Sequence, residues 1–214
     1  MQTLSAIEVR ILGSLIEKEL TTPEYYPLSA NALTNACNQK NNRDPVVSYD
    51  EILVSNEVEN MKDKLLVGKV MGTGSRVPKY RHLMQNFFHF DEKEIPVMGV
   101  LMLRGAQTLG EIRSRTAPMK EFSRLEEVEL ILENLSKREN PFVTKLPKMP
   151  GQKDFRYLHL LCGMPDVEAM INEAKSESVN EKDRISFLEQ EIGNLKAEME
   201  NLKNQFGEFR KQFE

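Results

Sequence analysis

The chain has 214 residues, a hydrophobic content of 40% and a formal net charge of −4, which is the composition of an ordinary soluble globular protein. Its longest apolar run, residues 95–103, is too short for a membrane-spanning helix, which needs about 20 residues. Its first helical turns carry Glu8 and Arg10, where a secretory signal would need an apolar segment. Two cysteines are too few for a disulfide framework, so we expect a cytoplasmic protein without membrane partners.

The charge is distributed unevenly along the chain. Residues 1–163 hold 22 Lys and Arg against 21 Asp and Glu, whereas residues 164–214 hold 7 against 12. Nucleic-acid-binding domains usually carry a clearly basic surface. The nearly neutral first part therefore gives only weak support to nucleic-acid binding.

The first part of the chain contains an internal repeat. Residues 4–18 align with residues 90–104 at an offset of 86, which places Glu8 on Glu94 and Gly13 on Gly99. Further on, YRHL at 80–83 recurs as YLHL at 157–160. A repeat of this length indicates two copies of one small domain.

Capping boxes mark the helix starts in both copies. In an S/T-x-x-E box, the cap side chain and the glutamate each satisfy a backbone N–H near the start of the helix. The boxes are Ser5–Glu8, Ser48–Glu51, Thr108–Glu111 and Ser123–Glu126, with Asp91–Glu94 as an acidic variant. Together with apolar spacing near 3.6 residues, they predict helices at 5–20, 29–38 and 48–64 in the first copy and at 91–104, 108–116 and 123–138 in the second.

Two strand-like runs follow the third helix of each copy. They lie at 65–71 and 77–83, and at 142–146 and 155–161, around turns rich in glycine and proline, and they predict a β-hairpin in each copy. Three helices and a hairpin form the winged-helix order. The sequence therefore predicts a mainly α protein with small β-hairpins, of class α+β, with two tandem winged-helix domains at 1–86 and 87–163.

The last segment predicts a coiled-coil helix at 181–214, after a linker at 164–180. Its apolar residues alternate in steps of three and four over four heptads, and the candidate dimer contacts are Ile185, Leu188, Ile192, Leu195, Met199 and Leu202. In a parallel dimer the flanking pairs Arg184–Glu189, Glu191–Lys196 and Glu198–Lys203 are opposite in charge. We expect a parallel homodimer; the alternatives are that this helix folds back on its own domains or pairs with another protein.

Patterns that indicate catalysis or metal binding are scarce. The three histidines are scattered, and no C-x-x-C, H-E-x-x-H, Walker or G-x-G-x-x-G motif occurs. A lone cysteine in a second helix, here Cys37, is more often a small buried apolar residue than a nucleophile. We expect no enzymatic activity, no cofactor and no metal site.

The candidate binding residues lie in a polar loop and in the hairpins. Residues 21–46 lengthen the first copy around its second helix, and their dense amide and charged groups either satisfy local backbone groups at a helix end and turn or read base edges or a peptide. Positive charge gathers in the hairpins, whereas both third helices begin with acidic residues. The candidate nucleic-acid or partner-binding residues are Asn38, Gln39, Lys40, Asn42, Arg43, Lys69, Arg76, Lys79, Lys148 and Lys153.

Three segments carry a family resemblance. TTPEYYPLSANALTNACNQKNNRDPV at 21–46, LRGAQTLGEIRSR at 103–115 and PFVTKLPKMPGQKDFRYLHL at 141–160 resemble the signature segments of the YceH-like family of bacterial proteins of unknown function. The resemblance spans most of the first 162 residues and implies tandem winged-helix domains. It brings no established activity, catalytic residue or cofactor to carry over.

The sequence is compatible with two functions. The chain is either a dimeric protein that associates with duplex DNA through its wings and polar loop, with a transcription-related role, or an adaptor that docks a protein partner on the same surfaces without direct DNA binding. The acidic third helices favour the adaptor, whereas the frequency of DNA-binding winged helices in bacteria favours DNA association, which we take as the leading hypothesis.

Overall fold

A computed structural model describes residues 3–71, 77–149, 152–172, 188–200 and 203 of the chain. The described residues up to Lys148 and from Lys153 to Pro165 belong to one compact unit, which holds both copies of the repeat. Met149, Gln152 and the described residues from Asp166 onward belong to a second unit.

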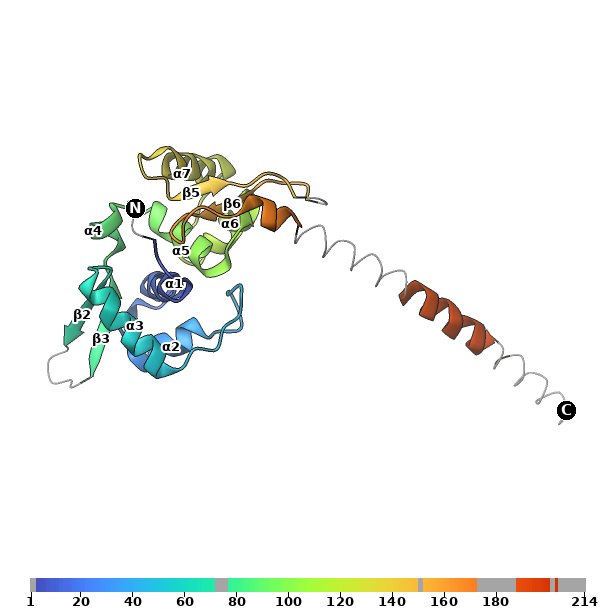
Figure 1. Ribbon diagram of the computed structural model, residues 1–214, viewed down its shortest axis with the longest axis horizontal. Coiled ribbons are helices and arrows are strands. Elements are labelled where there is room, and N and C mark those ends of the chain that lie inside the picture. The colour runs from blue at the N-terminus through green and yellow to red at the C-terminus, as the bar shows by residue number, and fades with distance from the viewer. Residues whose placement is uncertain (1–2, 72–76, 150–151, 173–187, 201–202, 204–214) are drawn as a thin grey trace. The chain divides into compact units, whose positions relative to one another are not determined.

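The first repeat runs as helix, strand, helix, helix and hairpin (Figure 1). Its elements are α1 (Ala6–Thr21), the short 3-10 helix η1 (Pro23–Tyr25), β1 (Leu28–Ser29), α2 (Ala30–Cys37), α3 (Glu51–Asp63), β2 (Val67–Met71) and β3 (Pro78–His82). The strands form an antiparallel sheet in the order β1-β3-β2. Tyr80 in the central strand lies opposite Leu28 on one side and Lys69 on the other.

The second repeat has the same order of elements. They are α5 (Glu94–Arg104), β4 (Gln107–Thr108), α6 (Leu109–Thr116), α7 (Leu125–Lys137), β5 (Val143–Lys145) and β6 (Arg156–His159), and the sheet order is β4-β6-β5. Tyr157 takes the place of Tyr80, between Gln107 and Lys145. The predicted α+β class is confirmed. The helix α4 (Met84–Phe88), which the sequence did not predict, links the repeats and spans the predicted domain boundary.

Three of the five predicted caps form as expected. Ser5 with Glu8 and Thr108 with Glu111 are complete capping boxes. Asp91 and Glu94 exchange the same two hydrogen bonds at 2.8 and 3.0 Å, although α5 itself begins only at Glu94, with Lys93 at its N-cap position.

The boxes predicted for the third helices are wrong. The side chain of Asp50 caps α3 by accepting from the backbone N–H of Leu53 at 2.7 Å. In α7, Glu127 accepts from the backbone N–H of Arg124. Both helices therefore begin two or three residues later than predicted. At α3 this happens because aspartate caps a helix as well as serine does.

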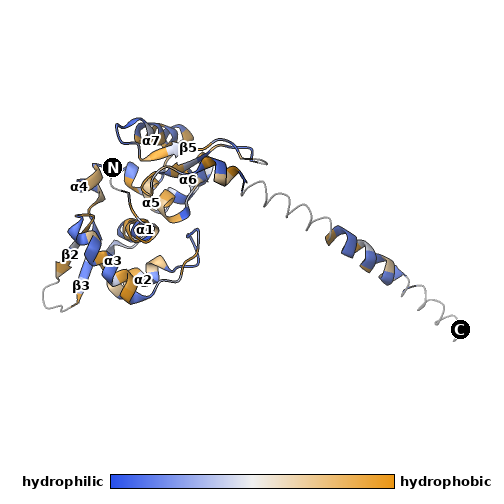
Figure 2. Ribbon diagram, viewed as in Figure 1, coloured by the Kyte–Doolittle hydropathy of each residue, from blue (hydrophilic) through white to orange (hydrophobic). Residues whose placement is uncertain are grey.

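The two equivalent first helices, α1 and α5, pack against each other and make the largest contact between any two helices of the described chain (Figure 1). Every residue of α5 from Glu94 to Leu103 is buried, and its ribbon is mostly apolar (Figure 2). A helix buried on all sides is the centre of a core rather than a surface element. The two repeats therefore share one hydrophobic core, which is continuous from Leu4 to Leu161.

Two equivalent glycines make this close approach possible. A Cβ atom on Gly99 would lie 2.8 Å from Cγ2 of Ile16 in α1, and a Cβ on Gly13 would lie 3.0 Å from the side chain of Leu103 in α5. Real Cβ atoms essentially never approach other atoms as closely as 2.8 Å. The glycines that align in the repeat are thus the contact points between its copies.

Equivalent ion pairs join the first and third helix of each repeat. The buried carboxylate of Glu8 accepts from Nζ of Lys64 at 2.6 Å, and Glu94 accepts two bonds from Nη2 of Arg138 at 2.7 and 2.8 Å. Lys64 and Arg138 occupy the C-cap positions of α3 and α7. Each glutamate therefore caps its own helix and also anchors the end of another.

Substituting Gly99 with alanine should lower the free energy of unfolding by about 1–3 kcal/mol, because the added methyl group overpacks the contact with Ile16. Gly110→Ala is the matched control, since a Cβ there meets nothing within 4 Å. Alanine in that helix should raise stability by about 0.5–1 kcal/mol. Urea unfolding of both variants measures the difference, and equal effects at the two sites would contradict the packing described here.

A buried histidine should make stability depend on pH. Burial lowers the pKa of His159 from 6.5 to about 4. The folded state therefore disfavours the proton that the unfolded state binds, and stability falls as pH drops through the window from 6.5 to about 4. Compared with the His159→Leu variant, the free energy of unfolding of the wild type should fall by on the order of 3 kcal/mol across this window. Urea unfolding between pH 4 and 7 measures the loss.

The control for this pH dependence is His89→Asn. His89 is exposed and has a φ of 54°, a backbone conformation that asparagine tolerates. This variant should keep the pH dependence of the wild type. If the difference in free energy of unfolding between the wild type and His159→Leu stays constant with pH, His159 does not titrate as expected.

Candidate functional site

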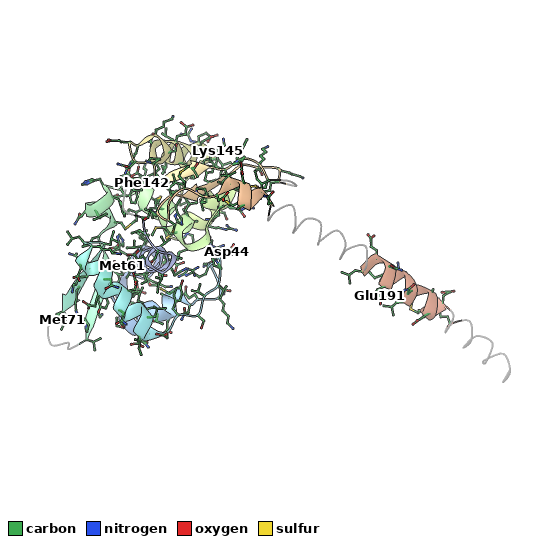
Figure 3. All side chains as sticks on the ribbon, viewed as in Figure 1. Asp44, Met61, Met71, Phe142, Lys145 and Glu191 are labelled. Atoms are coloured by element: carbon green, nitrogen blue, oxygen red, sulfur yellow. The ribbon has the colours of Figure 1, made fainter. Side chains whose placement is uncertain are left out.

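The polar loop at residues 38–46, marked by Asp44 in Figure 3, is held from inside by Arg43. Its side chain is fully buried and donates to both carboxylate oxygens of Glu17 in α1, at 2.6 and 3.0 Å. It also donates to the backbone carbonyl of Ala36 at 2.8 and 3.1 Å. Contrary to the prediction, Arg43 does not lie on a recognition surface. Its partner Glu17 is 26 positions away, and no local sequence pattern indicates the pair.

A second buried arginine reinforces this loop. Arg10, on α1, donates to the carbonyl of Cys37 at 3.2 Å and to the carbonyl of Pro45 at 2.5 Å. On the other side, the backbone N–H of Asp44 donates to the carbonyl of Leu103 at 2.9 Å. The loop thus contacts the first helix of both repeats.

Three predicted amide side chains are engaged within the protein. Asn38 exchanges two hydrogen bonds with the backbone of Tyr49, at 2.7 and 2.8 Å. Gln39 accepts from Arg43, and Asn42 accepts from the guanidinium of Arg104. These contacts favour the interpretation that this polar stretch satisfies a helix end and turn.

A pocket of about 630 Å³ lies beside the loop, between the two repeats. The last turns of α1 and α5, the end of α6 and the loop itself form its walls. Its charged lining residues are Glu17, Lys18, Lys40, Arg104 and Arg115. Sequence reasoning singled out Lys40 but missed Lys18, Arg104 and Arg115, because each is an ordinary basic residue near the end of a helix.

In the first hairpin, the free cations lie on the outward face of the sheet. Lys79 and Arg81 are exposed and alternate along β3 with the buried Tyr80, as side chains alternate across a strand. Lys69 differs, because its Nζ lies 2.6 Å from a carboxylate oxygen of Glu59. Arg76 lies outside the described residues.

The acidic partner of Lys69 is strongly stabilised in its ionised form. Hydrogen bonds from Lys62 and Lys69 lower the pKa of Glu59 to about 2, although its burial opposes this shift. Tyr80 also donates to Glu59 at 3.0 Å. Lys69 therefore shares the single charge of Glu59 with Lys62, and this ion pair makes Lys69 less available for contacts with phosphate.

The second hairpin carries its cations beside an aromatic ring. Nζ of Lys145, labelled in Figure 3, lies 4.4 Å from the ring centre of Phe155, and Nζ of Lys148 lies 4.9 Å from it. Lys153 is exposed as well. Arg156, which aligns with Lys79, is instead held by Glu111 and the carbonyl of Ala106. The first hairpin thus exposes its cations on a sheet face, whereas the second holds them beside the ring of Phe155.

The exposed faces of the third helices combine acidic and apolar side chains. On α3, Ile52 is 74% exposed and follows the exposed Glu51. On α7, Leu130 is 59% exposed and lies one helical turn from the exposed Glu126 and Glu133. Neither face resembles a surface that enters a DNA groove, because carboxylates repel phosphate groups.

Cys37 lies in the core, and burial raises the pKa of its thiol to about 11. It is therefore a protonated thiol at neutral pH, as expected for a small buried residue. Across the described ranges, no cluster of three or more His, Cys, Asp or Glu has the geometry of a metal site. None of the described helices is long and apolar enough to cross a membrane.

The C-terminal unit contains a helical segment at 188–200 whose residues are all exposed. Four of the candidate dimer contacts lie on it, with exposed fractions between 49% and 61%: Leu188, Ile192, Leu195 and Met199. The other two, Ile185 and Leu202, lie outside the described residues. The described part of the heptad pattern is therefore an apolar stripe on an exposed helix.

The structure defines an α+β protein whose main compact unit is built from two equivalent repeats, and comparisons with known proteins agree on its family. The profile of the DUF480 family, proteins of unknown function, matches residues 4–152. A UPF0502 protein of Geotalea daltonii is 48% identical over 99% of both chains, and one of Vibrio parahaemolyticus is 45% identical over 94% of this chain and 95% of its own. The chain belongs to this family, as its resemblance to YceH-like proteins predicted.

Proposed function

We propose that the chain is a non-enzymatic tandem winged-helix protein that associates with duplex DNA through its hairpins. The repeated order of helix, strand, helix, helix and hairpin supports the winged-helix assignment. The observation that carries the proposal is the exposed pair Lys79 and Arg81 on the outward face of the first sheet. Cations on an outward sheet face can contact the phosphate groups of DNA, and no helix needs to enter a groove for this contact to form.

The second hairpin supplies further phosphate contacts. Lys145, Lys148 and Lys153 are exposed there. The acidic third helices stay outside the groove in this arrangement, so binding rests on the backbone and depends weakly on DNA sequence. The polar loop contributes little, because Asn38 and Arg43 bond within the protein.

Dimerisation through the C-terminal helix would strengthen these contacts. The exposed apolar stripe at 188–200 and the opposite charges beside it support a parallel coiled coil. Two copies would present four hairpins, and linked weak sites bind much more tightly than single ones.

An adaptor that docks a protein partner is the second candidate. The exposed Ile52 and Leu130, each beside carboxylates, favour it. Exposed apolar surface rimmed by polar residues can mark a protein-interaction site, whereas carboxylates disfavour contact with DNA phosphates. In this alternative the same chain would bind no DNA directly.

A salt titration of duplex binding tests the leading proposal. Wild-type affinity should fall steeply as salt rises, because phosphate contacts release counterions. Lys79→Ala/Arg81→Ala should bind more weakly and with a slope shallower by up to about 2. Fluorescence anisotropy with a labelled duplex between about 50 and 200 mM salt measures both quantities.

The control removes two positive charges elsewhere on the same unit. Lys93 and Lys137 are exposed, and Lys93→Ala/Lys137→Ala should bind DNA as the wild type does. Absence of binding at about 50 mM salt would refute DNA association and leave the adaptor. Equal losses in both variants would indicate only a response to net charge.

The dimer is tested by placing charge in the apolar stripe. Leu188→Asp/Leu195→Asp should convert a dimer into a monomer of 24.6 kDa, because aspartate at these positions has no apolar partner. Gln190→Asp/Ala197→Asp, which adds the same charge on the opposite face of the heptad, should remain dimeric. Light scattering reports the mass, and a monomeric wild type would exclude the homodimer.

A further inference from the structure

The pocket between the two repeats is lined by more basic than acidic side chains. Lys18, Lys40, Arg104 and Arg115 line it against one carboxylate, Glu17. That carboxylate is already bound at 2.6 and 3.0 Å by the fully buried Arg43. Lys18 also lies 3.6 Å from Glu17, and Arg115 pairs with Glu111 at 3.1 Å. The exposed Asp44 lies nearby on the loop. These acidic groups are still fewer than the basic ones, so the pocket keeps an excess of positive charge.

We propose that this pocket binds a small organic anion with at least two negative charges, recognised through its phosphate or carboxylate groups. The site is independent of the DNA-binding surface, which lies on the hairpins. Lys40, Arg104 and Arg115 are the residues that would contact the anionic groups.

Hydrogen-bond donors remain free for such a ligand. Arg104 donates to Asn42, and Arg115 donates to Gln107 at 2.8 Å and to Glu111 at 3.1 Å. A guanidinium carries five N–H donors, so each arginine is positioned by its protein contacts and keeps donors for an anion. Lys40 is exposed and forms no hydrogen bond or ion pair with the described part of the chain.

The positive groups lie close enough to disfavour one another. Burial first, and then the charges of Arg115 and Arg43, lower the pKa of Arg104. Part of this charge faces the C-terminal ends of α1, α5 and α6, whose carbonyl groups favour cations. That effect accounts for a basic residue at the end of any one helix. It does not explain why the basic residues of three helix ends face the same pocket as Lys40, which is not on a helix.

The size and the apolar wall of the pocket indicate an organic ligand rather than a bare ion. Its volume of about 630 Å³ lies within the range of about 300–1,000 Å³ that is usual for small-molecule sites. Val100, Leu103, Pro118 and Met119 form its apolar part. A ligand with a charged end and a less polar body would fill both regions and contact both repeats.

Isothermal titration calorimetry on the full chain tests the site with three probes: inorganic pyrophosphate, ATP and citrate. At least one should bind once per chain, with affinity that falls as salt rises. Lys40→Glu should weaken it at least about tenfold, which corresponds to about 1.4 kcal/mol. Arg104→Gln should weaken it too, whereas the control Lys93→Glu, on an exposed site outside the pocket, should not.

The pattern among the probes identifies the recognised chemistry. Binding of pyrophosphate and ATP without citrate indicates a phosphate ligand, and tighter binding of ATP adds a role for the apolar wall. Binding of citrate alone indicates a carboxylate ligand. The proposal is overturned if no probe binds at up to about 10 mM, or if Lys40→Glu and Lys93→Glu bind equally well. Neither result bears on the hairpins, so failure here leaves DNA association standing.

Discussion

The contact between α1 and α5 is the constraint on which the rest of the structure depends. At Gly13 and Gly99, equivalent positions of the repeat, the two first helices lie so close that a Cβ on Gly99 would collide with Ile16 and a Cβ on Gly13 would press against Leu103. The other helices α2, α3, α4, α6 and α7 and both sheets contribute side chains to a single core around this pair. The repeats are therefore two halves of one compact unit.

The repeats differ where the first one gains its polar loop. Arg10 and Arg43 hold the loop from inside, and the carbonyl of Leu103 and the side chain of Arg104 receive it on the second repeat. The dense polar insertion is thus a structural bridge between the repeats, and it also forms one wall of the pocket. The shared framework builds the core, and the unshared insertion lines a pocket between the copies.

Sequence reasoning recovered the features that depend on local pattern. The repeat, the helices, the hairpins and the Ser5 and Thr108 caps follow from spacing and residue type. It missed β1 and β4, because two-residue strands carry no periodicity, and it chose the wrong caps for α3 and α7, where several polar residues precede the helix. It assigned Arg43 to the surface because the buried partner Glu17 is distant in sequence. The pocket combines residues from four segments, which only tertiary packing brings together.

The most direct test of DNA association through the hairpins is a map of backbone amide chemical shifts during titration with a short duplex. Contacts through the outward sheet face predict changes concentrated at 78–82, 143–148 and 153–158, with α3 and α7 little affected. Changes confined to 51–63 and 125–137, or none at all, would contradict the proposed mode of binding.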